Sequence, residues 1–439
     1  MAGPATGIPR VRSFRLANGL QVRLAPDRRS PTASVWVWYR VGSKNEHPGI
    51  TGASHWVEHM LFQGSPRYGK GQIDRAVIRV GGELNAFTDT DYTAYFSTVP
   101  REHVEVPLDI ESDRMTRALL RDEEVERERT VIYSEREGNE NWPEFRVWEE
   151  ILELAFRVHP YRWDALGYRS DIEHLTPQQL RDYYHRFYGP RNAVLVVAGG
   201  IEPTAIERSV RRRFSGLPST GDDVTVPVRE PPPNGERRAE LSGPGTTPIV
   251  EIAWRVPGLL DPATPSTLLV DTVLGGDVPL FSVWGSPPGA DHPASRLYRA
   301  LVDSGLAVRA GSNWHPHIYP GIFSIATLAA PGVALDRLEE RIEDVVERFL
   351  RTGPTRAEME DARAKFRRGA ALAYEGASRS AYRLGYFASV APPGFESRLL
   401  RAVLRTSARE VRDHARTMLR ESARIVVRYT PTGGTADAD

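Results

Sequence analysis

The chain has 439 residues, no cysteine and a formal net charge of zero, from 57 basic and 57 acidic residues. The length suits two or three domains, and the balanced charge argues against nucleic acid or an anionic membrane as the main partner. Without cysteine, disulfides, Cys-ligated metals and thiol catalysis are excluded, so a metal would need His, Asp or Glu ligands. No apolar run reaches the roughly 18 residues of a membrane-spanning helix. The N-terminus lacks the apolar core of a secretory signal, which predicts a cytoplasmic protein, although its lack of acidic residues leaves a cleaved transit peptide open.

Strand signals dominate the start of the chain. Asn18-Gly19 is a typical hairpin turn between two short alternating runs, Phe14–Leu16 and Leu20–Leu24. Residues Ala33–Val41 are apolar at nearly every position, which predicts a central strand. The later elements expected in this half are helices over 51–63, 109–120, 123–138 and 175–187, and strands over 84–98 and 192–197.

Residues 216–236 are rich in Pro, Gly and Asp, which is typical of an interdomain linker. After this linker the order of elements repeats: Trp254-Arg-Val-Pro257 is similar to Tyr39-Arg-Val-Gly42. We therefore predict a domain over 1–215, a homologous domain over 237–430 and a disordered tail over 431–439. Hairpin-linked strands mixed with helices predict an α+β fold, with helices packed on one face of a mostly antiparallel sheet in each copy.

His55-Trp-Val-Glu-His59 is the segment with the clearest chemistry. On a helix, His55 and His59 lie on one face, about 6 Å apart at Cβ, so both imidazoles can reach one zinc ion through bonds of about 2.0–2.1 Å. Glu58 lies on the same side and can take a proton from an attacking water. The pattern predicts a hydrolytic Zn²⁺ site with Glu58 as general base. An exposed helix that carries these residues by chance is the alternative.

A hydrolytic zinc site usually has three protein ligands and one open position. The helix expected over 123–138 is rich in acidic candidates for the third ligand. Glu128 and Glu135 are seven residues apart and fall on one face of that helix. A charged face exposed to solvent explains the same residues, so the residues alone leave the third ligand open.

The sequence resembles the pitrilysin-type inverted zincins, the family of insulysin, mitochondrial processing peptidase and small bacterial processing peptidases. His55–Phe62 (HWVEHMLF) is similar to the family pattern H-[FL]-x-E-H-[ML]-x-F. Gly81-Gly82, Asn85-Ala86 and Asp91–Tyr95 are similar to its G-G-x-x-N-A-x-T-x-x-x-x-T-x-Y pattern. Glu128–Glu135 is similar to E-R-x-V-I-x-x-E.

This resemblance implies roles for five residues. Zinc would be held by His55, His59 and Glu135, with Glu58 as the general base. Glu128 would be a carboxylate that orients a ligand histidine from behind.

The resemblance also implies how a substrate is held. The strand that contains Asn85, Ala86 and Phe87 would be an edge strand beside the zinc, to which a peptide adds through backbone hydrogen bonds. An ordinary strand in which Asn85 serves only a turn is the alternative.

The second half lacks the predicted metal ligands. At the positions equivalent to the site residues it has Leu268, Asp271, Thr272, Ala362 and Gly369. No metal site is therefore expected in the second half, and one competent copy is paired with one structural copy.

A second difference from the family concerns the transition state. Members that stabilise it themselves carry an Arg and a Tyr, seven residues apart, in a second-half segment. In the matching segment, Ser295–Val308, these positions hold Leu301 and Val308, which cannot donate a side-chain hydrogen bond. The resemblance therefore implies a heterodimer in which this chain bears the zinc and a homologous partner supplies the Arg/Tyr pair. Residues 277–294 are an insertion relative to the family pattern, with no assigned role.

The main interpretation is a zinc metalloendopeptidase that cleaves peptides or unfolded polypeptides held as an added edge strand. A non-catalytic assembly subunit of the core-protein type is the alternative. The complete set of His55, Glu58, His59 and Glu135 argues for the enzyme. A presequence peptidase of an organelle would share the same chemistry.

Overall fold

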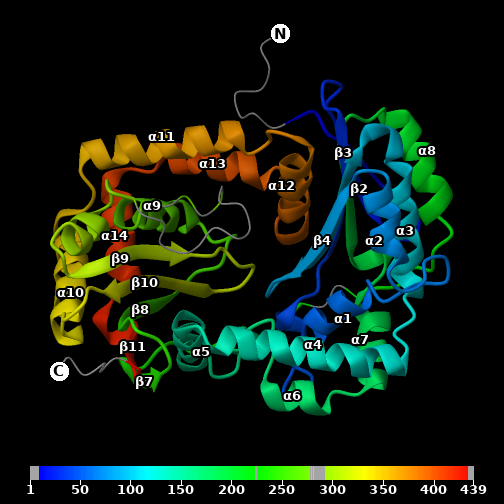
Figure 1. Cartoon of the computed structure of the whole chain (residues 1–439). Coiled ribbons are helices and arrows are strands. Elements are labelled where there is room, and N and C mark those ends of the chain that lie inside the picture. Colours follow the sequence, from blue (N-terminus) through cyan, green and yellow to red (C-terminus); the bar gives the residue numbers. More distant parts are fainter. Residues whose placement is uncertain (1–8, 223–224, 277, 279, 281–291, 434–439) are drawn as a thin grey trace, which may run out of the picture. The chain divides into compact units, whose positions relative to one another are not determined.

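The computed structural model describes residues 9–222, 225–276, 278, 280 and 292–433 (Figure 1). Most of the insertion predicted at 277–294 and most of the tail predicted at 431–439 lie outside the described residues. The chain packs into two units. Unit 1 contains Met1–Arg136, Trp163–Val228 and Ala371–Pro393, and unit 2 contains Glu137–Arg162, Arg229–Ala370 and Gly394–Asp439.

Unit 1 is built on a six-stranded sheet with the order β1-β2-β6-β3-β5-β4, in which only β2 and β6 pair in parallel. The strands are β1 (Arg12–Arg15), β2 (Gln21–Pro26), β3 (Thr32–Tyr39), β4 (Glu83–Thr88), β5 (Thr93–Pro100) and β6 (Ala193–Gly199). The turn predicted at Asn18-Gly19 joins β1 to β2, and the φ of 99° at Gly19 favours glycine there. The apolar run predicted as a central strand is β3, which lies between β6 and β5.

The single strand predicted over Leu84–Thr98 is wrong, because this segment forms two antiparallel strands, β4 and β5. The chain reverses after Asp89, whose N–H donates to Tyr92 O at 2.9 Å and whose Oδ1 accepts from Thr90 N–H. Asp residues favour such turns through side-chain bonds to the backbone. The reversal leaves β4 with β5 as its one neighbour, at the edge of the sheet.

One face of this sheet carries the core of unit 1. Side chains such as Val22, Val35, Val37 and Leu195 are fully buried there against the helices of the unit. These helices are α1 (Ala53–Met60), α2 (Gln72–Arg79), α3 (Glu105–Arg117), α4 (Asp122–Glu140), α6 (Arg169–His174), α7 (Pro177–Phe187) and α8 (Pro203–Phe214). The start predicted for α7 at Thr176 is confirmed, because its side chain accepts from Gln179 N–H at 3.3 Å as an N-cap.

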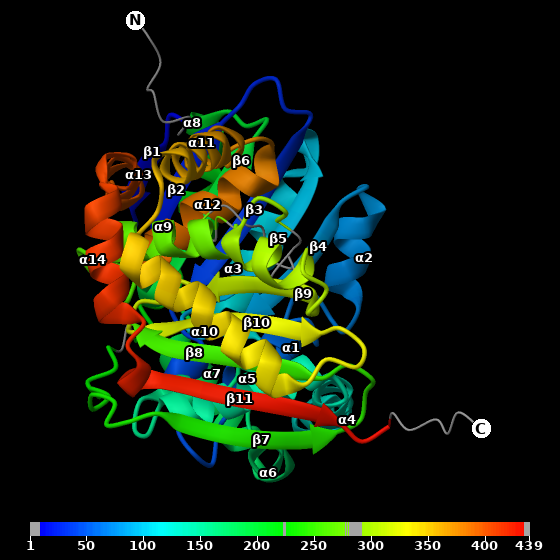
Figure 2. The same ribbon diagram turned by 90° about the vertical axis from the view of Figure 1, so that its left-hand side faces the viewer.

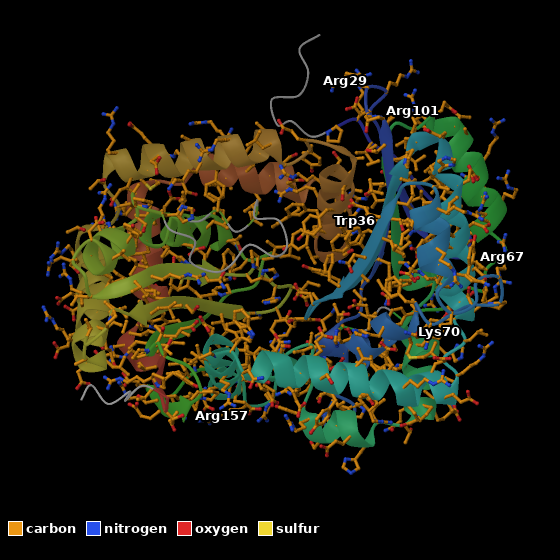
Figure 3. The ribbon with its side chains drawn as sticks, in the orientation of Figure 1. Arg29, Trp36, Arg67, Lys70, Arg101 and Arg157 are labelled. Carbon is orange, nitrogen blue, oxygen red and sulfur yellow. The ribbon has the colours of Figure 1, made fainter. Side chains whose placement is uncertain are left out.

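The other face of the sheet is covered by α12 (Ala377–Val390), which comes from the second half of the sequence. Trp36 and Trp38 of β3 point to this face (Figure 3 labels Trp36), and their rings contact Tyr382 of α12 at centroid distances of 5.7 and 5.4 Å. A Cβ atom at Gly385 would lie 1.9 Å from Trp38 Nε1, so only glycine permits this close approach. Sequence reasoning did not find this helix.

Unit 2 contains a five-stranded sheet with the order β7-β11-β8-β10-β9 (Figure 2). The strands are β7 (Arg237–Gly243), β8 (Ile249–Val256), β9 (Ala307–Trp314), β10 (Gly321–Ala329) and β11 (Arg424–Pro431). The parallel pair β7/β11 and the antiparallel series that follows repeat the pairing of β2/β6 and of β6, β3, β5 and β4. The predicted α+β fold with two homologous sheets is thus confirmed.

Helices cover both faces of this second sheet as well, so the predicted packing of helices on one face alone is wrong in both copies, because each sheet also receives a helix from the other half of the sequence. The helices of this unit are α5 (Pro143–Ala155), α9 (Thr264–Leu274), α10 (Leu335–Thr352), α11 (Arg356–Leu372), α13 (Phe395–Arg405) and α14 (Ala408–Met418). Helix α5 comes from the first half of the sequence, and its Val147 and Ile151 are buried with Ala253 and Val427 of the sheet. The two copies therefore exchange one helix each, α5 for α12, which is why the units do not follow the sequence repeat.

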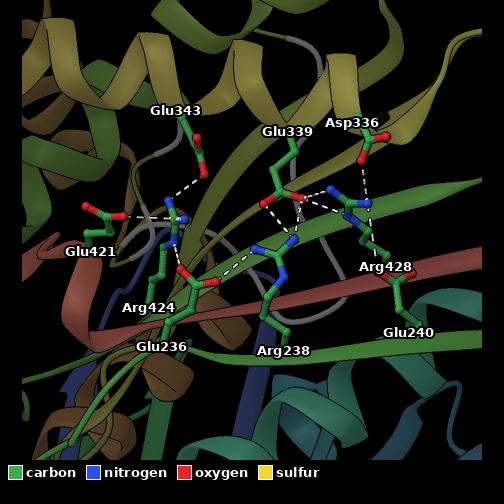
Figure 4. A network of polar contacts seen from close by, with 9 residues as sticks. All are labelled: Glu236, Arg238, Glu240, Asp336, Glu339, Glu343, Glu421, Arg424 and Arg428. Carbon is green, nitrogen blue, oxygen red and sulfur yellow. Dashed lines mark hydrogen bonds and ion pairs between the residues drawn. The ribbon is translucent and has the colours of Figure 1, made fainter.

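A network of ion pairs joins α10 to β7 and β11 (Figure 4). Asp336, Glu339 and Glu343 follow one face of α10 at spacings of three and four residues. Arg428 of β11 donates to Asp336 at 2.7 Å, and Arg238 of β7 donates to Glu339 at 2.8 Å. This network secures α10 on the face of the sheet opposite α5.

The predicted linker is held to unit 2 by Glu230. Its carboxylate accepts from the N–H groups of Arg157, Val158 and His159 at 2.9, 2.9 and 3.0 Å. None of the helices in the described part of the chain has the length and apolar character needed to span a bilayer.

Candidate metal site and its surroundings

Helix α1 carries His55, Glu58 and His59, and a buried polar side chain forms hydrogen bonds with the backbone at each of its ends. At its start, the Glu46 carboxylate accepts from Gly52 N–H and Ser54 N–H, both at 2.8 Å. At its end, Arg114 donates to Leu61 O at 3.4 Å. Burial raises the pKa of Glu46 to about 8 against these two bonds, so the hydrogen bonds themselves, rather than a full negative charge, cap the start of the helix. Sequence reasoning found neither residue, because both lie outside the helix.

Three predicted ligand atoms converge beside this helix. The Nε2 atoms of His55 and His59 lie 3.2 Å apart. Glu135 Oε2, from α4, lies 3.6 Å from His55 Nε2 and 3.5 Å from His59 Nε2. Two ligand atoms on a tetrahedral ion with bonds of about 2.0–2.1 Å lie about 3.3–3.4 Å apart. The three side chains could therefore hold one metal ion.

Glu135 is the most exposed of the three side chains. This side chain is 43% exposed, whereas those of His55 and His59 are 10% and 20% exposed. Solvent therefore reaches the Glu135 side chain, so the group of three ligands is not fully enclosed as a closed structural site would be.

Glu128 of α4 lies on the Nδ1 side of the His59 ring. Its Oε1 is 2.9 Å from His59 Nδ1, and its Oε2 accepts from Gln63 Nε2 at 2.8 Å. Because a carboxylate only accepts, Nδ1 donates here, and Nε2 is directed at the possible ligand position. Gln63 holds Glu128 in turn and was not predicted. By contrast, His55 Nδ1 is buried and has no hydrogen-bond partner among the described residues, so no carboxylate holds that ring through its Nδ1 atom.

The charges around the site favour a cation. Burial and the neighbouring His59 lower the pKa of His55 to about 4. Burial opposes a charge on His59 too, but its contacts with the Glu128 and Glu135 carboxylates raise its pKa to about 9. The contact with His59 lowers the pKa of Glu135. The carboxylates of Glu128 and Glu135 thus lie beside the imidazole nitrogens, and their negative charge favours a cation there.

Glu58, the predicted general base, lies on the same helix and is 8% exposed. Its Oε2 accepts from Thr88 Oγ1 at 2.6 Å. Burial raises the pKa of Glu58 to about 7, against the opposing effect of Thr88. A carboxyl group with a pKa near neutrality is suited to general-base catalysis at neutral pH.

The predicted substrate residues Asn85, Ala86 and Phe87 lie on the edge strand β4. Ala86 and Phe87 are buried, and Asn85 is exposed. Asn85 Oδ1 accepts from Ala86 N–H at 2.8 Å, so the Asn85 side chain already occupies one donor of this strand. On the α12 side, Phe87 packs against Trp36 and Trp38.

The equivalent part of unit 2 has no such group of ligands among the described residues. Leu268, Asp271 and Thr272 lie on α9, and Ala362 and Gly369 lie on α11. Asp271 is fully buried and bonds to Ser312 Oγ of β9. At the predicted Arg/Tyr positions, Leu301 is fully buried and Val308 is 52% exposed.

Comparison with known proteins agrees with this geometry. The profile described as Insulinase (Peptidase family M16) matches residues 21–167, and the profile described as Peptidase M16 inactive domain matches residues 174–366. The chain belongs to this family. It is 26% identical to the zinc protease PqqE of Helicobacter pylori over 360 residues, which cover 80% of this chain and 78% of that protein.

Two further likenesses cover much of the chain. It is 30% identical to the uncharacterized zinc protease SCO5738 of Streptomyces coelicolor over 312 residues, which cover 68% of this chain and 67% of that protein. The crystal structure of a protease from Helicobacter pylori has the same fold, with a TM-score of 0.88 and 23% identity, covering 97% of this chain and 100% of that one.

Proposed function

We propose that the chain is a zinc metalloendopeptidase. The observation that supports this most strongly is the convergence of His55 Nε2, His59 Nε2 and Glu135 Oε2 at 3.2–3.6 Å from one another. That spacing suits a tetrahedral ion, and the donor set of two imidazoles and one carboxylate is typical of hydrolytic zinc. When bound, zinc would activate a water molecule and polarise the peptide carbonyl.

The residues of the chain have separate roles in this proposal. Glu58 takes a proton from the attacking water and passes it to the amine leaving group, so the peptide bond breaks with no net change in protonation of the base. Glu128 holds His59 through Nδ1. Gln63 holds Glu128 through its other oxygen.

The substrate is proposed to be an extended peptide or an unfolded polypeptide that adds to β4. An edge strand presents unpaired backbone groups, and these read the extended shape of a peptide more than its sequence. Ala86 N–H lies on this edge strand and donates to Asn85 Oδ1 at 2.8 Å. A peptide that pairs at Ala86 would therefore displace the Asn85 side chain.

Metal analysis and peptide cleavage test this function together. We expect about one zinc per chain, cleavage of an unstructured peptide within its sequence, and loss of cleavage with a chelator. His59→Ala should lose both zinc and activity, whereas Glu58→Gln should keep zinc and lose activity. A wild-type chain that binds zinc but cleaves no peptide, alone or with a homologous partner, would favour the non-catalytic assembly subunit.

We also propose that a homologous partner supplies an Arg/Tyr pair to the transition state. Leu301 is buried and apolar and Val308 is apolar, so neither can donate to a developing oxyanion. The expected result is that the purified chain cleaves peptides slowly and that a co-expressed homologue with both residues raises kcat. Equal rates with and without that homologue would contradict the heterodimer while leaving the zinc chemistry intact.

A further inference from the structure

Thr88 joins the edge strand to the proposed general base. It is the last residue of β4, and its Oγ1 lies 2.6 Å from Oε2 of Glu58 on α1. Its other polar neighbour, Thr93 Oγ1 on β5, lies farther away, at 3.5 Å. The shorter contact, to a carboxylate, is the stronger hydrogen bond of the two.

The surrounding hydroxyl groups set the direction of this bond. Thr93 Oγ1 donates its one hydrogen to Val41 O at 2.9 Å, and Tyr188 OH lies 3.4 Å from the Thr93 oxygen. Thr93 therefore has no hydrogen left to donate to Thr88. Since a carboxylate only accepts, the Thr88 hydroxyl hydrogen is donated to Glu58.

This bond makes the two oxygens of Glu58 unequal. Oε2 is held by Thr88, and among the described residues no hydrogen bond is formed by Oε1. We propose that Thr88 is a positioning residue: it fixes the carboxylate so that Oε1 takes the proton from the attacking water. The inference rests on the proposed peptidase function. Thr88 belongs to β4, the strand to which the substrate would add. The same strand would therefore hold both the general base and the substrate.

Unit 2 offers a matched internal control. There a carboxylate on the equivalent helix, Asp271 of α9, bonds to a hydroxyl on the equivalent edge strand, Ser312 of β9. No set of metal ligands accompanies this pair among the described residues. If such a contact only ties a helix to an edge strand, its loss should change kcat equally in the two units. If the contact in unit 1 positions Glu58, its loss should lower kcat in unit 1 alone.

The test compares Thr88→Val, Thr88→Ser and Ser312→Ala in the full-length chain, assayed in the form that is active, with or without a homologous partner. Thr88→Val removes the hydroxyl and keeps the shape. It should lower kcat by about 10- to 100-fold, the usual effect of losing a supporting hydrogen bond at a metal site. KM and the zinc content should stay within about twofold of the wild type, because Thr88 contacts neither a ligand atom nor the proposed binding groups of β4.

Thr88→Ser keeps the donor and should recover most of kcat, and Ser312→Ala should keep wild-type kcat. A Thr88→Val variant with wild-type kcat would overturn the inference while the peptidase function stands. Equal losses of kcat in Thr88→Val and Ser312→Ala would also overturn it, since the contact would then be structural. A wild type that binds zinc but shows no cleavage in either form would overturn the proposed function and the inference with it.

Discussion

His59 Nδ1 lies 2.9 Å from Glu128 Oε1, although 69 residues separate the two in sequence. The contact joins α1 to α4, the helix that also carries Glu135. It fixes the ring of His59 so that Nε2 is directed at the position shared with His55 and Glu135. The carboxylate thus acts on the site without being one of the three converging ligands.

Replacing Glu128 should therefore weaken metal binding while leaving the ligands in place. We expect Glu128→Gln to lower zinc affinity by about 10- to 100-fold, because the neutral amide accepts a weaker hydrogen bond from Nδ1 and its NH₂ group would face the Gln63 donor. Competition with a chromophoric chelator measures the affinity. Glu123→Gln on the same helix is the control, because Glu123 lies five residues before Glu128 and its side chain is 85% exposed. Equal affinities for the two variants would contradict the role of Glu128.

Glu46 should stabilise α1 from outside the helix. It is 4% exposed and accepts from two backbone N–H groups at the helix start. In Glu46→Gln, one of these N–H groups would face an amide NH₂ group, which we expect to cost about 1–3 kcal/mol of unfolding free energy. Urea unfolding measures the change. Glu102→Gln, at an exposed position before α3, is the control and should leave the urea midpoint unchanged. If Glu46→Gln has the same midpoint as this control, Glu46 does not stabilise α1.

Glu251 of β8 predicts how stability depends on pH. Burial raises its pKa from 4.5 to about 7, against an opposing hydrogen bond with Ser324. The neutral form is favoured in the folded chain, so this contribution is fully present below pH 4.5 and is lost as pH rises through 7. The shift corresponds to about 3 kcal/mol between the two limits.

Glu251→Gln should remove this dependence, because the amide stays neutral at every pH. We expect the variant to be more stable than the wild type at pH 8 and similar to it at pH 4.5, by thermal unfolding at both pH values. Glu347→Gln on α10 is an exposed control. A wild type and a Glu251→Gln variant with parallel pH profiles would show that the buried carboxyl has no such effect.

A substitution at Gly385 tests how tightly α12 packs on the sheet of unit 1. A methyl group there would meet Trp38 Nε1 at 1.9 Å. We expect Gly385→Ala to destabilise the fold by about 1–3 kcal/mol, since neither the helix nor the strand can yield without repacking. Gly138 of α4 is the matched control, because a Cβ atom there meets nothing within 4 Å. Gly138→Ala should be neutral or slightly stabilising, as alanine favours a helix by about 1 kcal/mol over glycine. Equal urea midpoints for both variants would contradict the tight packing of α12.

Local signals in the sequence predicted several elements of the fold and the pair His55 and His59 as candidate metal ligands, whereas Glu135 and Glu128 were assigned through the family resemblance. The hairpin at Asn18-Gly19, the buried strand β3 and the capped start of α7 all follow from short-range chemistry. The segment over Leu84–Thr98 was misread because apolar residues on both sides of Asp89 hid a turn. That error concealed the hairpin itself, although the family resemblance already implied that β4 lies at an edge.

The sequence by itself limited the possible metal ligands to His, Asp and Glu, since cysteine is absent, and it placed His55 and His59 one helical turn apart, but it left the third ligand open. Only the tertiary structure decided that Glu135 converges with them, that Thr88 holds Glu58 and that Glu46 caps α1. It also decided the exchange of α5 and α12. The physical reason is range: helix and turn patterns depend on neighbours a few residues apart, whereas these contacts join segments brought together only when the sheets and helices bury their apolar faces.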